Sequence, residues 1–310
     1  MKQARGSRLL VLGWHNVEGT WCFPADRGAG LRGLARQLRV LKRLTTVVPL
    51  GAALCDLAAG RPLPPRATAI TFDDGYRDNL TLAAPLLREW GLPATCFLVP
   101  GLLDRTARAW WEELASAVAN ARAREITWRG RTYLVRTPAE RGAAAGALSA
   151  ALKGLDRADR DAAVDELTGL LEPTQDYRVE EHFMDWDEAR RLRDSMEIGS
   201  HSLHHAILSR ESDEQQLTDL ATARSQLQER LDVDAPVLAY PNGTTADYTA
   251  GTVSAARRAG HSHAVTTLRG FNEAHTPRYE VRRTVMSPER GLTDLRKLLR
   301  DAVRRDGVGR

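Results

Sequence analysis

The chain has 310 residues, of which 43% are hydrophobic and 27% charged, so it can bury a sizeable core as one large α/β domain or two smaller ones. Its formal net charge is only +4 and no polybasic block stands out, which argues against nucleic acid as a partner. Cys22, Cys55 and Cys96 are widely spaced, which favours reduced thiols over a disulfide framework or a thiolate metal site.

The amino terminus predicts no export signal. Met1 to Arg8 is basic, but the apolar run that follows stops at Gly13, which is too short for the core of a signal peptide. No stretch reaches the roughly 20 apolar residues of a membrane-spanning helix. We therefore expect a soluble, cytoplasmic protein without a transmembrane segment.

Strand-like and helix-like segments alternate along the chain. The predicted strands are Leu9 to Leu12, Thr46 to Pro49, Ala67 to Phe72, Ala94 to Val99, Glu197 to Gly199, Val237 to Ala239, Ala264 to Thr267 and Val281 to Val285. The predicted helices include Leu31 to Leu44, Leu80 to Trp90, Asp213 to Leu231 and Thr249 to Ala259. This alternation predicts a parallel sheet, either closed into a barrel or doubly wound, with functional groups at the carboxyl ends of strands.

Residues 104–181 interrupt this alternation. Trp110-Trp111-Glu112-Glu113 opens a helical stretch, Ile126 to Val135 reads as a hairpin around Arg129-Gly130, and two helices follow. We interpret 104–181 as a mainly helical insertion within a single domain of residues 1–310. Helices that pack on the barrel rim are the simpler interpretation, and a lid that contacts substrate is the alternative.

Two more helix signals follow the insertion. Asp185 and Glu188 have the spacing of a capping box, which gives these acids a structural role. Residues 291–310 predict a basic carboxyl-terminal helix and tail, since leucines alternate there with Lys and Arg from Leu295 to Arg305.

Two distant motifs have residues that suit metal chemistry. Thr71-Phe72-Asp73-Asp74-Gly75 places two carboxylates at a strand end, and His201-Ser202-Leu203-His204-His205 places two imidazoles four positions apart, the spacing of one helical turn. Taken singly, the acids could cap a helix or form a surface ion pair, and a His-x-x-x-His pair often binds nothing. Together they predict a divalent-metal site with one carboxylate left as a base, because a carboxylate beside a cation stays ionised.

These motifs resemble the first two signatures of the polysaccharide deacetylases, carbohydrate esterase family four, also called the NodB-homology family. The resemblance covers about Arg8 to Pro100 and Met184 to Val285 and implies a distorted (β/α)7 barrel. It makes Asp73 the general base and gives the metal to Asp74, His201 and His205, leaving His204 as a bystander. The implied cation is commonly zinc, although Co²⁺, Ni²⁺ or Mn²⁺ suit the same ligands.

The third family motif is altered. The segment Leu238-Ala239-Tyr240-Pro241-Asn242-Gly243 resembles the variant in deacetylases of exported bacterial glucosamine polymers, and it lacks the usual arginine. We expect Arg283 to orient the base instead. The resemblance implies that the backbone N–H of Asn242 stabilises an oxyanion and that Tyr240 lies at the substrate site. A Pro-Gly turn without a catalytic role is the alternative.

The family's usual Leu-x-His motif for the general acid is missing after Val281. In the permuted variant, the poly-N-acetylglucosamine type, a histidine after the first strand takes its place, and the pattern around Trp14-His15-Asn16 is similar. His15 is therefore the expected acid, against the alternative that it only forms a hydrogen bond at the barrel rim. His261, His263 and His275 are weaker candidates.

The resemblance implies a metal-dependent N-deacetylase that converts the acetamide of an N-acetylated amino sugar to a free amine and acetate. An intracellular glycolipid, surface glycan or glycosylated metabolite would suit the predicted location. Two alternatives stay open at this point. The chain could be an O-acetyl esterase or another amide hydrolase acting on carbohydrate, or it could be a catalytically silent carbohydrate-binding domain.

Overall fold

The computed structural model describes residues 7–24, 30–287, 295–297 and 299–300. The predicted basic helix and tail over residues 291–310 lies largely outside these described residues. No helix among the described residues is long and apolar enough to cross a membrane. The cellular location stays a prediction.

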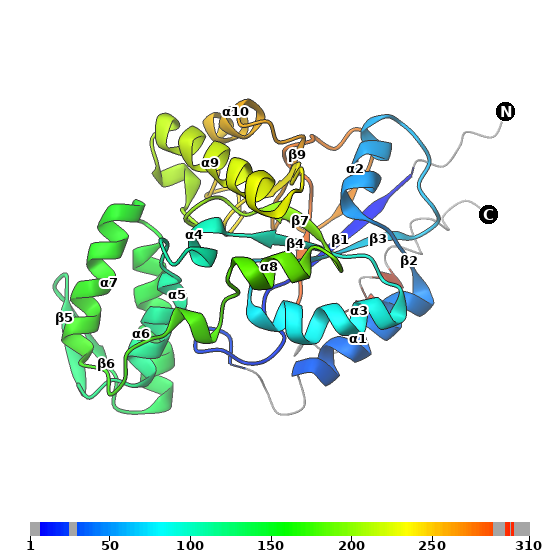
Figure 1. Ribbon diagram of the computed structural model, residues 1–310. Coiled ribbons are helices and arrows are strands. Elements are labelled where there is room, and N and C mark those ends of the chain that lie inside the picture. Colours follow the sequence, from blue (N-terminus) through cyan, green and yellow to red (C-terminus); the bar gives the residue numbers. More distant parts are fainter. Residues whose placement is uncertain (1–6, 25–29, 288–294, 298, 301–310) are drawn as a thin grey trace.

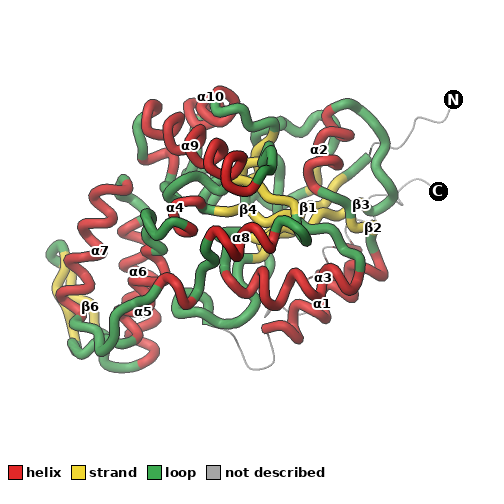
Figure 2. Tube along the Cα trace, viewed as in Figure 1, coloured by secondary structure: helices red, strands yellow, loops and turns green. Residues whose placement is uncertain are grey.

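A curled parallel sheet forms the centre of the molecule (Figure 2). Its hydrogen-bonded neighbours are, in order, β1 (Leu9–Trp14), β3 (Ala67–Phe72), β4 (Thr95–Leu98), β7 (Glu197–Ser200), β8 (Val237–Ala239) and β9 (His263–Val265). Residues 281–285 connect the two ends of this sheet, because Val281 bridges Val265 while β11 (Thr284–Val285) pairs with β1. The result is the distorted (β/α)7 barrel that the resemblance implies.

Two short strands lie outside the ring. β2 (Thr46–Val47) pairs with β3, and the antiparallel β10 (Phe271–Asn272) pairs with β1. The predicted strand from Thr46 to Pro49 is therefore shorter than expected and is not part of the barrel. β10 was not predicted, since two residues are too few for a periodic pattern.

Helices surround the strands, with α1 and α3 on one side in Figure 1 and α9 and α10 on the other. The helices around the barrel are α1 (Gly30–Leu44), α2 (Leu50–Ala58), the π-helical turn η1 (Asn79–Ala83), α3 (Ala84–Trp90), α4 (Pro100–Leu103), α8 (Trp186–Leu192), α9 (Asp213–Leu231) and α10 (Ala250–Arg258). Two 3-10 turns, η2 (Val179–Glu181) and η3 (Leu208–Arg210), complete this set. The predicted capping box at the start of α8 is confirmed, with reciprocal hydrogen bonds between Asp185 and Glu188.

The strands are buried on both faces, as a parallel sheet covered by helices requires. Leu10 and Leu12 of β1 face the layer of α1 and α3, whereas Leu9 and Val11 face the barrel interior. Helix α2 packs its leucines against this interior cluster. The sequence analysis did not single out α2, because a short segment that is apolar on most sides shows little helical periodicity.

The segment that interrupts the alternation has its own apolar cluster, which includes Trp110, Trp128 and Val164. Its elements are α5 (Trp110–Ala119), β5 (Glu125–Trp128), β6 (Arg131–Leu134), α6 (Pro138–Leu152) and α7 (Arg157–Leu171). They lie together at one side of the barrel (Figure 1). The predicted hairpin and the predicted helices of this segment are confirmed.

Candidate metal centre and active site

Asp73 and Asp74 follow the last residue of β3, and both are buried. The N–H of Asp73 continues the sheet by donating to the carbonyl of Trp14. Asp74 has a left-handed backbone, with φ of 70°, and Gly75 follows at 80°. A non-glycine residue rarely adopts this conformation, and the turn sends the two adjacent carboxylates to different partners.

His201 follows β7, and its N–H donates to the carbonyl of Leu98 on the neighbouring strand. The ring Nδ1 lies 2.7 Å from the carbonyl oxygen of Ala239. A carbonyl only accepts hydrogen bonds, so Nδ1 carries the proton and donates it. In the neutral ring the lone pair is therefore on Nε2, the form in which imidazole binds a metal.

His205 reaches the same place, but not by the predicted helical turn. Ser202 and His205 both have left-handed backbones, with φ of 64° and 51°, and the segment is a loop. The loop is held at Leu203, whose N–H donates to Asp219 and whose carbonyl accepts from Gly101. The helical prediction was wrong because spacing alone cannot show that a backbone held by neighbouring elements leaves the helical region.

The third imidazole of the motif lies outside this cluster. Nδ1 of His204 is 2.9 Å from the other carboxylate oxygen of Asp219, on α9. The ring of His205 instead packs against the indole of Trp111, with 4.4 Å between the centroids. Burial lowers the pKa of His205, which favours the neutral ring that can bind a cation.

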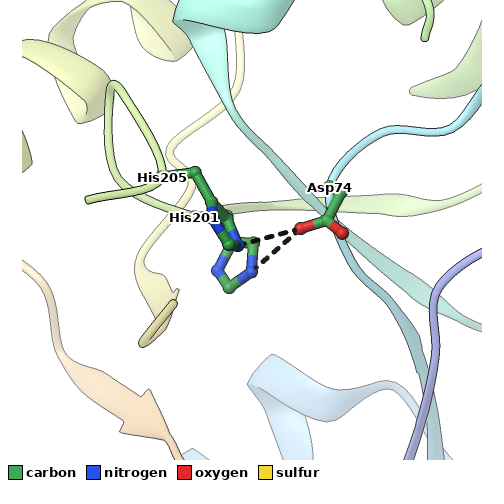
Figure 3. Close-up of side chains that lie close together, drawn as sticks. All are labelled: Asp74, His201 and His205. Atoms are coloured by element: carbon green, nitrogen blue, oxygen red, sulfur yellow. Dashed lines mark ion pairs between the residues drawn. The ribbon is translucent and has the colours of Figure 1, made fainter. Parts of the chain in front are cut away.

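Asp74, His201 and His205 converge on one point (Figure 3). Oδ1 of Asp74 lies 3.3 Å from Nε2 of each histidine, and the ligand atoms all lie within 4.8 Å of one another. Burial alone would raise the pKa of Asp74, but the two imidazoles lower it well below its usual range. Burial alone would lower the pKa of His201, but the contact with Asp74 raises it, so either a proton or a shared cation can lie between the carboxylate and Nε2. One oxygen and two nitrogens suit a divalent transition metal.

Asp73 turns away from this cluster toward Arg283, which lies just before β11. Nη1 of the fully buried Arg283 is 2.5 Å from Oδ1 of Asp73 and 3.2 Å from Oγ1 of Thr71. Burial alone would raise the pKa of Asp73, but Arg283, followed by His201 and His15, lowers it overall. The carboxylate is therefore ionised, and its second oxygen is not engaged by the guanidinium.

His15 lies on the other side of Asp73, directly after β1. Its Nε2 is 3.8 Å from Oδ2 of Asp73, and a quarter of its side chain is exposed. The start of η1 holds the backbone around His15: Asn79 donates to the carbonyl of His15, and Asp78, the residue before η1, accepts the N–H groups of Val17 and Glu18. Nε2 of His15 and Oδ2 of Asp73 therefore face each other, and His15 is the more exposed of the two side chains.

The altered third motif follows β8. Tyr240 is buried and stacks on Tyr248, with 4.7 Å between the ring centroids. Asn242 has a left-handed φ of 59°, and its carbonyl accepts from Oγ1 of Thr267. No hydrogen bond among the described residues engages the backbone N–H of Asn242.

The other candidate histidines lie apart from this site. His263 begins β9, and His261 precedes it, so both are at the amino end of a strand whose carboxyl end faces the site. Burial lowers the pKa of each to about 4. His275 is exposed and lies 3.7 Å from Glu273.

Sequence reasoning missed three residues that border the metal cluster. Trp111 and Glu112 come from α5, and Tyr76 follows the Asp-Asp motif. The hydroxyl of Tyr76 donates to the fully buried Glu112 at 2.8 Å and accepts from Nε1 of Trp111 at 2.9 Å. The sequence gives one signal, an acid that directly follows two tryptophans at the start of a predicted helix.

The polysaccharide deacetylase family model matches residues 60–264. The poly-beta-1,6-N-acetyl-D-glucosamine N-deacetylase of Escherichia coli K12 is 30% identical over 101 residues, which cover 32% of this chain and only 15% of that relative. Streptococcus pyogenes deacetylase PplD, solved with acetate, has a TM-score of 0.62 at 14% identity and covers 95% of this chain and 99% of its own. IcaB from Ammonifex degensii gives 0.58 at 19%, covering 96% and 98%. These two structures share the fold.

Asp78 provides a pH test of the loop that carries His15. Burial raises the pKa of Asp78 to about 6, above its value in an unfolded chain, so the native state keeps a proton that the unfolded chain has lost. The free energy of unfolding should therefore fall by about 2 kcal/mol, because of this group, as the pH rises from about 4 to about 7. Asp78→Asn keeps a neutral acceptor for both N–H groups and removes this dependence.

Urea denaturation of wild type and Asp78→Asn at several pH values measures the effect. The stability of wild type relative to the variant should decline as the pH rises. A difference that stays constant across this range would contradict the assignment.

Proposed function

Because this chain belongs to the polysaccharide deacetylase family, we propose that it is a metal-dependent N-deacetylase of an N-acetylated amino sugar within a glycan. One observation carries the proposal: the two adjacent acids, Asp73 and Asp74, have different partners. Asp74 shares one point with two imidazoles, while Asp73 stays outside that cluster, ionised by Arg283. The name of the Escherichia coli relative makes N-acetylglucosamine polymers the first substrates to test.

The proposed metal ligands are Asp74, His201 and His205. A divalent cation bound there would polarise the acetamide carbonyl and lower the pKa of a nearby water. Zinc fits two imidazoles and a carboxylate, and Co²⁺, Ni²⁺ or Mn²⁺ can use the same ligands. The carbonyl of Ala239 fixes His201 in the tautomer that leaves Nε2 available.

Asp73 is the proposed general base. Its free oxygen accepts a proton from the water as the water oxygen attacks the acetamide carbon. Arg283 holds the carboxylate in place through Oδ1, and the Arg283 guanidinium is itself held by Thr71 and by the carbonyl of Thr266. This contact supports Arg283 as the replacement for the arginine that the third motif lacks.

The developing oxyanion needs a hydrogen-bond donor. The backbone N–H of Asn242 is proposed for this role, because a main-chain donor needs no particular side chain and none of the described residues accepts from it. The left-handed turn at Asn242 sets the direction of this N–H. Tyr240, packed against Tyr248, supports the turn from below.

His15 is the proposed general acid. Its Nε2 lies 3.8 Å from Oδ2 of Asp73, so a group bound beside this pair would reach both side chains. As the carbon–nitrogen bond breaks, the imidazolium gives its proton to the leaving nitrogen, which would otherwise depart as a strongly basic anion. The products are acetate and a free amine on the sugar.

A pair of variants tests the metal and the base separately. Asp73→Asn should retain the metal, because Asp73 is not one of the proposed ligands, and lose acetate release by about a thousandfold or more, because it removes both the proton acceptor and the charge that pairs with Arg283. His205→Ala should lose both the bound metal and the activity. Acetate release from poly-β-1,6-N-acetylglucosamine and metal content by elemental analysis are the measurements.

Loss of metal from Asp73→Asn, or full activity in His205→Ala, would contradict these roles. If wild type loaded with zinc or cobalt releases no acetate from N-acetylated glycans, the proposed function is wrong. Faster release from the matched O-acetylated sugar would make the chain an esterase.

Leaving-group chemistry tests His15. His15→Gln should lower the rate on an N-acetylated sugar by about a hundredfold to ten-thousandfold, since an amine leaves only after protonation. The same variant should retain most of its activity on 4-nitrophenyl acetate, whose leaving group needs no proton. Equal losses on the two substrates would mean that His15 is not the acid.

A further inference from the structure

Two aromatic side chains are exposed on the loop that follows His15. Trp21 is 38% exposed and Phe23 is 39% exposed. The other large hydrophobic residues exposed to this degree in the described part of the chain are leucines, at 44, 134 and 170. Two exposed rings on one short loop beside the candidate site differ from leucines scattered over separate elements, because apolar surface next to a site often serves binding.

The loop is held in a fixed shape by a buried carboxylate. Glu112 of α5 accepts from Oγ1 of Thr20 at 2.7 Å and from the N–H of Cys22 at 3.0 Å, on either side of Trp21. The loop also closes on itself, since the N–H of Thr20 donates to the carbonyl of Phe23 and Oγ1 of Thr20 accepts from the N–H of Phe23. The side chain of Cys22 packs inward, which leaves the rings of Trp21 and Phe23 outside.

The loop continues directly into the active site. The ring of Phe23 lies 5.6 Å from the ring of His15, at an angle of 31°. The carboxylate that holds the loop also accepts from Tyr76, two residues after Asp74, and Tyr76 in turn accepts from the indole of Trp111 that covers His205. Glu112, Tyr76 and Trp111 therefore connect the loop that carries the exposed rings to the metal cluster.

In the proposed mechanism, the sugar part of the substrate lies beside Phe23. His15 faces the leaving nitrogen, and this nitrogen is attached to the sugar, so a ring packed beside His15 is on the sugar side of the scissile bond. A pyranose presents C–H groups on its faces and hydroxyls around its edge. Flat aromatic rings with one exposed face suit such a partner, because they supply apolar contact area at little cost in conformational entropy.

We propose that Trp21 and Phe23, held by Glu112, form a stacking platform for the sugar rings of a glycan that extends beyond the residue being deacetylated. The proposal rests on the proposed function for the identity of the ligand. It predicts that the substrate has at least two linked hexosamine residues, and that a single N-acetylated sugar binds more weakly than an oligomer.

Binding is measured without turnover, in a chain that also carries Asp73→Asn. The probe is a β-1,6-linked tetramer of N-acetylglucosamine, titrated by calorimetry and compared with the monosaccharide. Replacing both rings, Trp21→Ala with Phe23→Ala, should weaken tetramer binding by roughly tenfold or more and weaken monosaccharide binding by a clearly smaller factor. Trp21→Phe alone should restore part of the affinity over Trp21→Ala.

The matched control is Leu134→Ala, which removes a side chain of similar exposure from β6, at 37%. It should bind the tetramer as tightly as the parent chain. Equal tetramer affinity with and without the two rings would overturn the proposal, and so would a tetramer that binds no better than the monosaccharide.

Activity of the same ring substitutions with Asp73 intact separates the two proposals. If acetate is released from the tetramer with unchanged kcat/KM, the platform is wrong and the deacetylase function stands. If tetramer binding depends on the rings and yet metal-loaded wild type releases no acetate from the tetramer, the platform stands and the proposed function is wrong.

Discussion

The buried ion pair between Asp73 and Arg283 is the contact on which the active site depends. The two residues are far apart in sequence, and they meet because residues 281–285 close the barrel between β9 and β1. Breaking a buried pair by removing one partner is costly, since the remaining charge has lost its water. The pair therefore links the closure of the barrel to the charge and the direction of the base.

The same pair separates the roles of two adjacent acids. Neighbouring carboxylates could both bind one cation, but the left-handed backbone of Asp74 directs its side chain to His201 and His205 while Asp73 turns to Arg283. In the proposed mechanism, one acid is thereby a metal ligand and the other is the base. Glu112 likewise connects two parts of the site. Its carboxylate holds the loop after His15 and, through Tyr76, is linked to the side chains around the metal cluster.

Sequence patterns predicted the parts of this arrangement that depend on strand ends. Motifs after β3 and β7 meet because these strands lie on either side of β4 with their carboxyl ends at one edge of the sheet, so Asp74, His201 and His205 could be grouped in advance. The path between the histidines was mispredicted, because left-handed residues 202 and 205 depend on contacts with Asp219 and Gly101. Trp111 and Glu112 were missed as site residues, since a helical pattern shows that a face is buried and not what it covers.

Anomalous X-ray diffraction from crystals grown with zinc would show which of the two adjacent acids binds the metal. We expect one strong zinc peak bound by Asp74, His201 and His205, with both oxygens of Asp73 outside the coordination sphere and Arg283 still paired with one of them. A zinc ion bound by Asp73, or zinc located away from these three side chains, would contradict this expectation.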